Sequence, residues 1–216
     1  MISVIFDMDG TLLDTQKVYI DAWEYAGREQ GIEGAGKYIP SVCGMNREGW
    51  SRFLIDRHPT LNVDRFNSDT HDYVSEHGEL KFKKGAREFL DYLKSKGVLI
   101  GLASGTSRPS IDHHLGELGV KEYFGAIAGG SDVKNCKPAP DVFLLSAKRL
   151  GVSPSDCFAF EDSENGIRSA HAAGMRVIGI ADIVPFSDEA RSLMYTELGD
   201  MLEAIDLFEE ILSKEI

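Results

Sequence analysis

The sequence is poor in cysteine and holds no long apolar run. Its 216 residues include 3 cysteines, Cys43, Cys136 and Cys157. This odd number and wide spacing disfavour a disulfide framework or a zinc site, so we expect reduced thiols. No apolar run approaches the roughly 20 residues that a membrane span needs, and the first residues resemble neither a leader nor a signal peptide. We therefore expect a soluble, cytoplasmic protein without a membrane partner.

Positive charge is also scarce. Lys and Arg number 23 against 35 Asp and Glu, a formal net charge of -12, which argues against nucleic acid as a partner. An anionic ligand would need local attraction from a metal, a lysine or a helix N-terminus. The length and the hydrophobic content of 43% favour one globular domain, or one domain with a small insert.

Short apolar stretches alternate with amphipathic ones over most of the chain. The pattern predicts strands at residues 2–6, 98–103, 126–128, 157–160 and 176–181. It predicts helices at residues 86–96, 109–118, 139–150, 165–173, 187–193 and 201–212. Such alternation is typical of βαβ units, so we expect an α/β fold built on a parallel sheet.

Residues 15–79 differ, because apolar residues recur there only at helical spacing. The pattern predicts three helices, near 18–26, 47–58 and 66–77, and no strand. We therefore expect a helical insert at 15–79 within a core formed by 1–14 and 80–216. The insert begins after the first strand and returns before the second. It should lie like a lid above the carboxyl edge of the sheet, where ligands bind in open α/β folds.

Two carboxylates, Asp7 and Asp9, follow the first strand and precede Gly10. In an extended segment they would share a face and repel, so that one is protonated or a cation lies between them. Both arrangements are useful, because a carboxylate beside Mg²⁺ can attack phosphorus and a protonated neighbour can transfer a proton. A plain turn also uses Asp and Gly. A calcium-binding EF-hand is set aside, since its closing Glu would fall at Val18.

Further polar residues follow the later strands. They are Ser104 and Gly105, then Lys137, then Glu161 and Asp162. Singly, each group has an ordinary explanation as a turn, a surface charge or a helix N-cap. In a doubly wound sheet, however, all of them converge with the first carboxylate pair at one edge.

The converging residues suit phosphoryl transfer. Mg²⁺ prefers a few carboxylates together with water and substrate phosphate. Asp7, Asp9 and Asp162 can supply that set. Glu161 would either bind the metal directly or hydrogen-bond to a group that does. The lysine and the hydroxyl and amides of the Ser-Gly pair can stabilise the negative charge of a transferring phosphoryl group.

Four motifs carry a resemblance to a known family. They are DMDGT at 7–11, ASG at 103–105, KPAPD at 137–141 and FEDSENGI at 160–167. Together they resemble the haloacid dehalogenase superfamily, in particular its phosphatase and β-phosphoglucomutase-like branch. The resemblance implies a Rossmann-like parallel sheet core with an inserted all-helical cap domain. It also implies a Mg²⁺-dependent reaction through an aspartyl-phosphate.

The resemblance further implies roles for single residues. Asp7 looks like the nucleophile and Asp9 like the general acid and base. Ser104 and Lys137 resemble the family's phosphate-binding pair, and Asp162 with Glu161 resembles the metal site. Because the family's dehalogenases lack the second carboxylate, its presence argues against carbon–halogen chemistry.

Two residues of the insert bear on substrate choice. Arg47 resembles the arginine that sugar-phosphate mutases use for a distal phosphate, although a solvated charge at a helix start is the simpler explanation. Tyr19 stands where counting from Asp9 places the histidine of the mutase pattern, which argues against a mutase. We therefore expect a phosphatase of a small phosphorylated metabolite, as a monomer or weak dimer. A sugar phosphomutase and a non-catalytic phosphometabolite-binding protein are the alternatives.

Overall fold

The computed structural model describes residues 2–214, and a six-stranded parallel sheet forms its centre. The strand order is β3-β2-β1-β4-β5-β6. The strands are β1 (Ser3–Phe6), β2 (Leu99–Ala103), β3 (Ala126–Ala128), β4 (Cys157–Glu161), β5 (Arg176–Gly179) and β6 (Thr196–Glu197). This arrangement confirms the α/β fold class with a Rossmann-like sheet. The sequence pattern had not indicated β6, whose two residues are too few to show a period.

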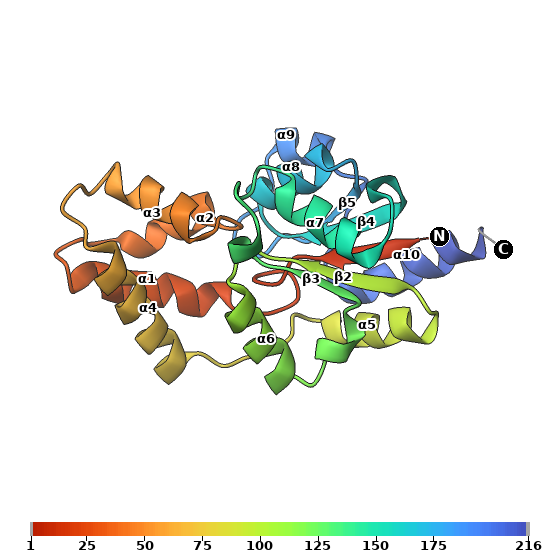
Figure 1. Cartoon of the computed structure of the whole chain (residues 1–216), viewed down its shortest axis with the longest axis horizontal. Helices are drawn as coiled ribbons and strands as arrows, with labels where there is room; N and C mark the ends of the chain where they lie inside the picture. The colour runs from red at the N-terminus through yellow and green to blue at the C-terminus, as the bar shows by residue number, and fades with distance from the viewer. Residues whose placement is uncertain (1, 215–216) are drawn as a thin grey trace.

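Helices cover both faces of the sheet (Figure 1). One layer consists of α5 (Ala86–Ser95), α6 (Arg108–Glu117) and α10 (Met201–Ser213), and the other of α7 (Asp141–Leu150), α8 (Glu164–Ala172) and α9 (Asp188–Ser192). Val4 and Phe6 of β1 pack in the first layer, and Ile5 packs in the second. A strand buried on both faces reads as a continuous apolar run, which is why β1 was recognisable from sequence.

The segment 15–79 folds into helices beside the carboxyl edge of the sheet, as Figure 1 shows. They are α1 (Gln16–Arg28), α2 (Ile39–Val42), α3 (Arg47–Ile55) and α4 (Val63–His77). No strand occurs in this segment, all of which the structure describes. Its own apolar cluster is built around Trp23, which packs edge-on against Trp50 and Phe66 with ring centroids 5.6 and 5.2 Å away. We call this segment the cap.

The chain crosses between core and cap twice, and backbone hydrogen bonds tie the two crossings together. The amide of Asp14 donates to the carbonyl of Lys81 at 2.9 Å, and that of Lys83 donates to Leu12 at 2.8 Å. The predicted boundaries, 1–14 and 80–216 for the core and 15–79 for the cap, place the division at these crossings. Within residues 2–214, no helix is both long and apolar enough to cross a membrane.

Candidate active site

Asp7 and Glu161 lie side by side because their strands are neighbours in register. Phe6 of β1 pairs with Phe160 of β4, and the amide of Asp7 donates to the carbonyl of Phe160 at 3.0 Å. Each carboxylate therefore begins at the same level, at the carboxyl ends of two adjacent central strands. This is the position at which ligands meet an open parallel sheet.

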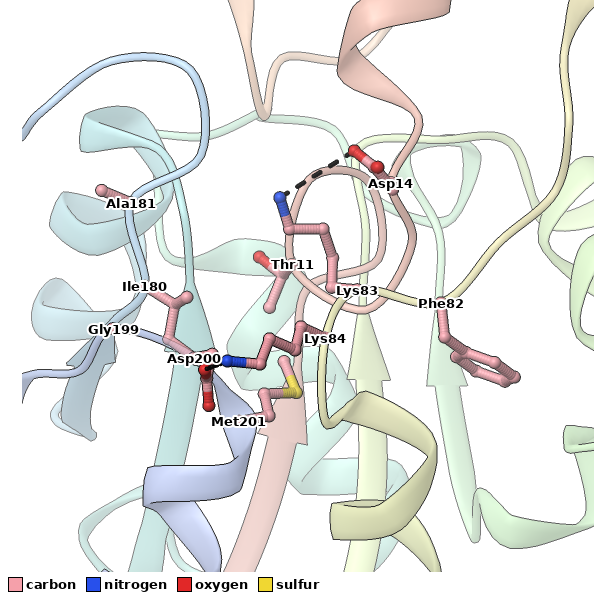
Figure 2. Close-up of a pocket in the computed structure, with 10 residues that line it drawn as sticks. All are labelled: Thr11, Asp14, Phe82, Lys83, Lys84, Ile180, Ala181, Gly199, Asp200 and Met201. Carbon is pink, nitrogen blue, oxygen red and sulfur yellow. Dashed lines mark ion pairs between the residues drawn. The ribbon is translucent and has the colours of Figure 1, made fainter.

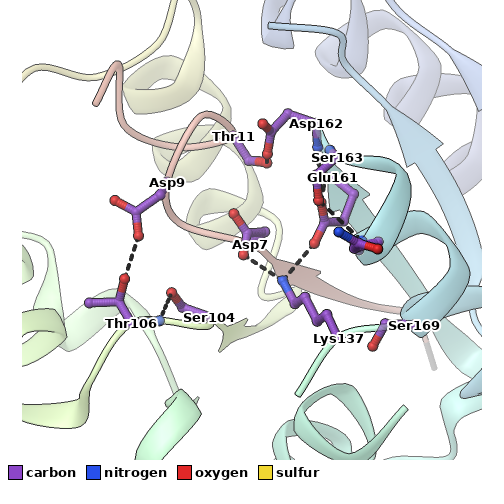
Figure 3. A network of polar contacts seen from close by, with 12 residues as sticks. Asp7, Asp9, Thr11, Ser104, Thr106, Lys137, Glu161, Asp162, Ser163 and Ser169 are labelled. Atoms are coloured by element: carbon purple, nitrogen blue, oxygen red, sulfur yellow. Dashed lines mark hydrogen bonds and ion pairs between the residues drawn. The ribbon is translucent and has the colours of Figure 1, made fainter. Parts of the chain in front are cut away.

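Lys137 joins these two carboxylates. Its Nζ donates to Oδ1 of Asp7 and to Oε1 of Glu161, at 2.6 Å each, and its side chain is 0% exposed (Figure 3). Burial alone would lower the pKa of the ammonium, but the attraction of the two carboxylates outweighs it and the pKa is raised. Lys137 is therefore a permanently charged group held by two anions.

Glu161 is fixed on its other side by the start of α8. Its Oε2 accepts from the amides of Asp162 and Ser163, at 3.1 and 3.2 Å, and from the Ser163 hydroxyl at 3.0 Å. Gly166 leaves the room for this, because a Cβ there would overlap the Glu161 carboxylate. Glu161 thus has protein donors on both oxygens, which fixes its carboxylate beside Asp7.

Asp7, Glu161 and Asp162 can together present oxygen atoms to one ion. One carboxylate oxygen from each lies within 4.8 Å of the other two, and all three residues are buried. Three carboxylates face a single ammonium, so the cluster has an excess of negative charge. Hard oxygen ligands with such an excess fit Mg²⁺ well.

The same excess shows in the pKa values of the acids. Burial, opposed by Lys137 and reinforced by Glu161, raises the pKa of Asp7 to about 7. Burial, together with Glu161 and Asp7, raises the pKa of Asp162 well above its usual range. A cation at this position would favour the ionised form of both acids.

Asp9 lies apart from this cluster, and its carboxylate turns toward two threonines. Oδ1 accepts from the Thr15 hydroxyl at 2.9 Å, and Oδ2 accepts from the Thr106 hydroxyl at 2.6 Å. In Figure 3 Asp9 and Thr106 lie on one side of Asp7, and Lys137 lies on the other. The two aspartates that the sequence placed together therefore have separate surroundings.

Ser104 and Gly105 lie at the end of β2, below the cap. Ser104 is buried, and its hydroxyl oxygen accepts from the amide of Thr106 at 3.0 Å. Gly105 lies so close to the cap that a Cβ there would come within 2.8 Å of the carbonyl oxygens of Gly44 and Met45. The cap loop therefore closes directly over the Ser-Gly pair.

Arg47, at the start of α3, is a predicted site residue that the structure leaves away from the edge of the sheet. Its guanidinium pairs with Asp64 at 2.5 Å on the cap surface, with side chains 54% and 92% exposed. The other predicted residues gather at the sheet edge: Asp7, Asp9, Ser104, Gly105, Lys137, Glu161 and Asp162.

A neighbouring cavity of about 380 Å³ shares Thr11 with the site (Figure 2). Two lysines line it, and both have carboxylate partners. Lys83 is 2.5 Å from Asp182, and Lys84 is 2.7 Å from Asp200. Both ammonium groups of this cavity are therefore already paired with a carboxylate.

Several residues that contact the carboxylates were not singled out from the sequence. They are Thr11, Thr15, Gln16, Thr106 and Ser163. Thr11, Thr106 and Ser163 stand in or directly beside the four motifs, so their position was a usable signal. Gln16 had no such signal, since a polar residue at a helix start is ordinary.

Comparison with known families gives one match over most of the chain. The model of a hydrolase family, described as haloacid dehalogenase-like hydrolase, matches residues 3–174. A phosphorylated carbohydrates phosphatase of Thermotoga maritima is 32% identical over 184 residues, which cover 83% of this chain and 85% of the relative.

Two further similar proteins differ in how much of their own length this chain covers. A bifunctional riboflavin kinase/FMN phosphatase of Arabidopsis thaliana is 31% identical over 94% of this chain, but the chain spans only 53% of that protein's length. The crystal structure of a β-phosphoglucomutase from Clostridium difficile superposes with a TM-score of 0.79 at 27% identity, and covers 96% of this chain and 99% of that one.

Proposed function

The chain belongs to the haloacid dehalogenase-like hydrolases, and from this premise we propose that it is a Mg²⁺-dependent phosphatase of a small phosphorylated metabolite. The family membership and the enzymatic class confirm what the four motifs implied. The observation that carries the proposal is the Lys137 ammonium, 2.6 Å from both Asp7 and Glu161. The relative from Thermotoga maritima, a phosphatase of phosphorylated carbohydrates, supports sugar phosphates as the first substrate class.

In the first step of the proposed reaction, Asp7 attacks the phosphorus of the substrate. A bond forms between a carboxylate oxygen and phosphorus, the ester P–O bond breaks, and Asp9 gives its proton to the leaving alkoxide. Asp9 suits this role because its carboxylate lies outside the buried cluster, with only threonine hydroxyls on its oxygens. These hydroxyls can both donate and accept, so they tolerate Asp9 with and without its proton.

In the second step a water molecule attacks the aspartyl-phosphate. Asp9 takes the proton of that water, the bond between phosphorus and Asp7 breaks, and inorganic phosphate leaves. Lys137 and the Ser104–Gly105 pair offer donors to the phosphoryl oxygens in both steps.

The proposed metal site consists of Asp7 and Asp162, with Glu161 behind them. When bound, Mg²⁺ supplies positive charge that offsets the three carboxylates and the incoming phosphate. A role for Asp9 as a further ligand stays a prediction, as does a cytoplasmic location. Arg47 also stays a predicted substrate contact, and it would have to leave Asp64 to reach one.

A phosphate-release assay tests the proposal. The purified protein is incubated with Mg²⁺ and a panel of sugar phosphates, phosphoglycolate and nucleotides. We expect release from at least one substrate, and loss to background in Asp7→Asn, which removes the nucleophile but keeps its shape. Asp14→Asn is the matched control, because Asp14 is exposed and lies outside the cluster. A fully active Asp7→Asn variant would overturn the assignment.

A sugar phosphomutase is the second candidate, favoured by the likeness to the β-phosphoglucomutase structure. Tyr19 in the place of the histidine and the pairing of Arg47 with Asp64 both argue against it. The discriminating assay adds a trace of sugar bisphosphate to a sugar 1-phosphate. Isomerisation would support the mutase, and phosphate release alone would exclude it.

A further inference from the structure

Gln16 contacts the proposed metal site although it belongs to none of the four motifs. It is the first residue of α1, and it is buried, with 5% of its surface exposed. Its side-chain amide donates to Oδ2 of Asp162, while Thr11 donates to Oδ1 at 2.8 Å. Both oxygens of Asp162 are therefore held by donors from the segment that follows β1.

The local backbone makes room for this contact. Gly10 has a φ of 83°, and a Cβ there would overlap both the Gln16 amide and the Asp162 carboxylate. A side chain at position 10 would thus be strained and would also separate Gln16 from Asp162. The glycine of the first motif therefore serves the approach of these two side chains.

The chemistry of the neighbours sets the orientation of the Gln16 amide. Oδ2 of Asp162 accepts from the NH₂ group, which leaves the amide oxygen for another donor. The oxygen, Oε1, then faces Cys43 of the cap, whose thiol donates to it at 3.4 Å. Burial and the nearby carboxylates raise the pKa of the Cys43 thiol, so it keeps the proton that it donates.

These contacts cross the boundary between cap and core. Gln16 and Cys43 belong to the cap, and Asp162 belongs to the core. A second contact follows the same path, since the Asn165 side chain donates to the carbonyl of Cys43 at 3.1 Å. A cavity of about 310 Å³ opens at this junction, and the same four residues are among those that line it.

We propose that Gln16 is a positioning residue that orients Asp162 for Mg²⁺ and couples this orientation to the cap through Cys43. The inference rests on the proposed metal site. Some side chains hydrogen-bond to a metal ligand and fix its rotamer. Removing such a side chain typically weakens metal binding by about 10- to 100-fold. The NH₂ group of Gln16 holds Asp162 in this way. Its Oε1 contacts Cys43, next to the cap loop that closes over Ser104 and Gly105.

Isothermal titration with Mg²⁺ alone tests the first half. Gln16→Met keeps the length of the side chain but cannot donate, and we expect it to weaken Mg²⁺ binding by about 10- to 100-fold. Cys43→Ala leaves the donor on Asp162 in place, and we expect it to bind Mg²⁺ nearly as tightly as the parent. Equal affinity in Gln16→Met and parent would overturn the proposal. Circular dichroism shows that both variants are folded before titration.

Hydrogen–deuterium exchange tests the coupling. In the parent, Mg²⁺ should slow exchange of the backbone amides at 41–46, and in both Gln16→Met and Cys43→Ala this protection should be lost. Retained protection in both variants would overturn the coupling.

The outcomes separate this inference from the proposed function. If the parent binds Mg²⁺ but releases no phosphate, the proposed phosphatase activity is wrong, and the titration of Gln16→Met still tests the role of Gln16. A parent that binds no Mg²⁺ would overturn both.

Discussion

The ion pair of Lys137 and Asp7 in the core differs from the ion pair of Arg47 and Asp64 in the cap in its exposure to solvent. The side chains of Lys137 and Asp7 in the core are 0% and 5% exposed, whereas those of Arg47 and Asp64 in the cap are 54% and 92% exposed. Removing one partner of a buried pair costs about 3 to 5 kcal/mol, because a charge is left without a partner. An exposed pair contributes about 0 to 1 kcal/mol.

This contrast separates two tasks. The core holds its charges in place, as a reacting centre requires. The exposed pair of the cap can open at little cost. The following predictions test whether the difference is real.

The largest effect is expected for Lys137→Met. It leaves Asp7 and Glu161 buried without their ammonium partner. We expect the free energy of unfolding to fall by about 3 to 5 kcal/mol, and phosphate release to disappear. Urea denaturation at pH 7.5 measures the first, with Arg47→Met as the matched control from the cap. A Lys137→Met protein as stable as the parent would remove the contrast between the pairs.

The next effect concerns pH and the metal-free protein. The pKa of Asp7 is about 7 in the folded state against 3.8 in the unfolded one. Between these values the folded protein holds a proton that the unfolded chain has released, so rising pH lowers the free energy of unfolding. The raised pKa of Asp162 acts in the same direction.

We therefore expect the protein in EDTA to lose on the order of a few kcal/mol of stability between pH 4 and pH 7 through Asp7. Thermal unfolding across this range measures the loss. Asp7→Asn should show a shallower pH dependence, and Mg²⁺ should restore stability at the upper end. The same slope in Asp7→Asn and parent would show that Asp7 is not the group that titrates.

Thr106→Val is expected to have an intermediate effect, on turnover rather than on stability. It removes the hydroxyl that donates to Oδ2 of Asp9 at 2.6 Å. A hydrogen bond to a charged group is worth about 1.5 to 3 kcal/mol, so kcat should fall by roughly 10- to 100-fold. Thr106→Ser keeps the hydroxyl and should retain most of kcat. If both variants lose activity equally, packing and not the hydroxyl is responsible.

The smallest effect is expected for Arg47→Ala. Because the pair with Asp64 is exposed, the free energy of unfolding should change by less than about 1 kcal/mol. Steady-state kinetics with the substrate then test whether Arg47 also contacts the substrate. A raised KM in Arg47→Ala together with a lowered KM in Asp64→Asn, which frees Arg47, would show that it reaches the substrate. Unchanged KM values in both would leave Arg47 a surface residue.

Element boundaries show where sequence patterns stop being informative. The helix predicted at 66–77 begins at Val63, because the Asn62 side chain caps it by accepting from the amide of Arg65. The strand predicted at 176–181 ends at Gly179. Residues 35–42, where the pattern predicts no helix, form a 3-10 turn and the short helix α2. Such pieces depend on tertiary contacts more than on their own pattern.

Within the candidate site, the motif residues were predictable and their partners were not. Asp7, Lys137 and Asp162 follow strands with a strong apolar signal, which places them at one edge. Gln16 contacts Asp162 from 146 positions away in the chain. No local pattern encodes such a contact, because it depends on how the cap is set against the core.

The sequence alone determined the order of β1–β5 and of the longer helices, the helical character of 15–79 and the motif residues, because these are local properties of period and spacing. Only the tertiary structure decided that Lys137 joins Asp7 and Glu161, that Asp9 turns to two threonines, and that Arg47 turns to Asp64. The physical reason is distance along the chain. The register of β1 with β4 pairs Phe6 with Phe160, and Lys137 reaches Asp7 from 130 positions away in the chain.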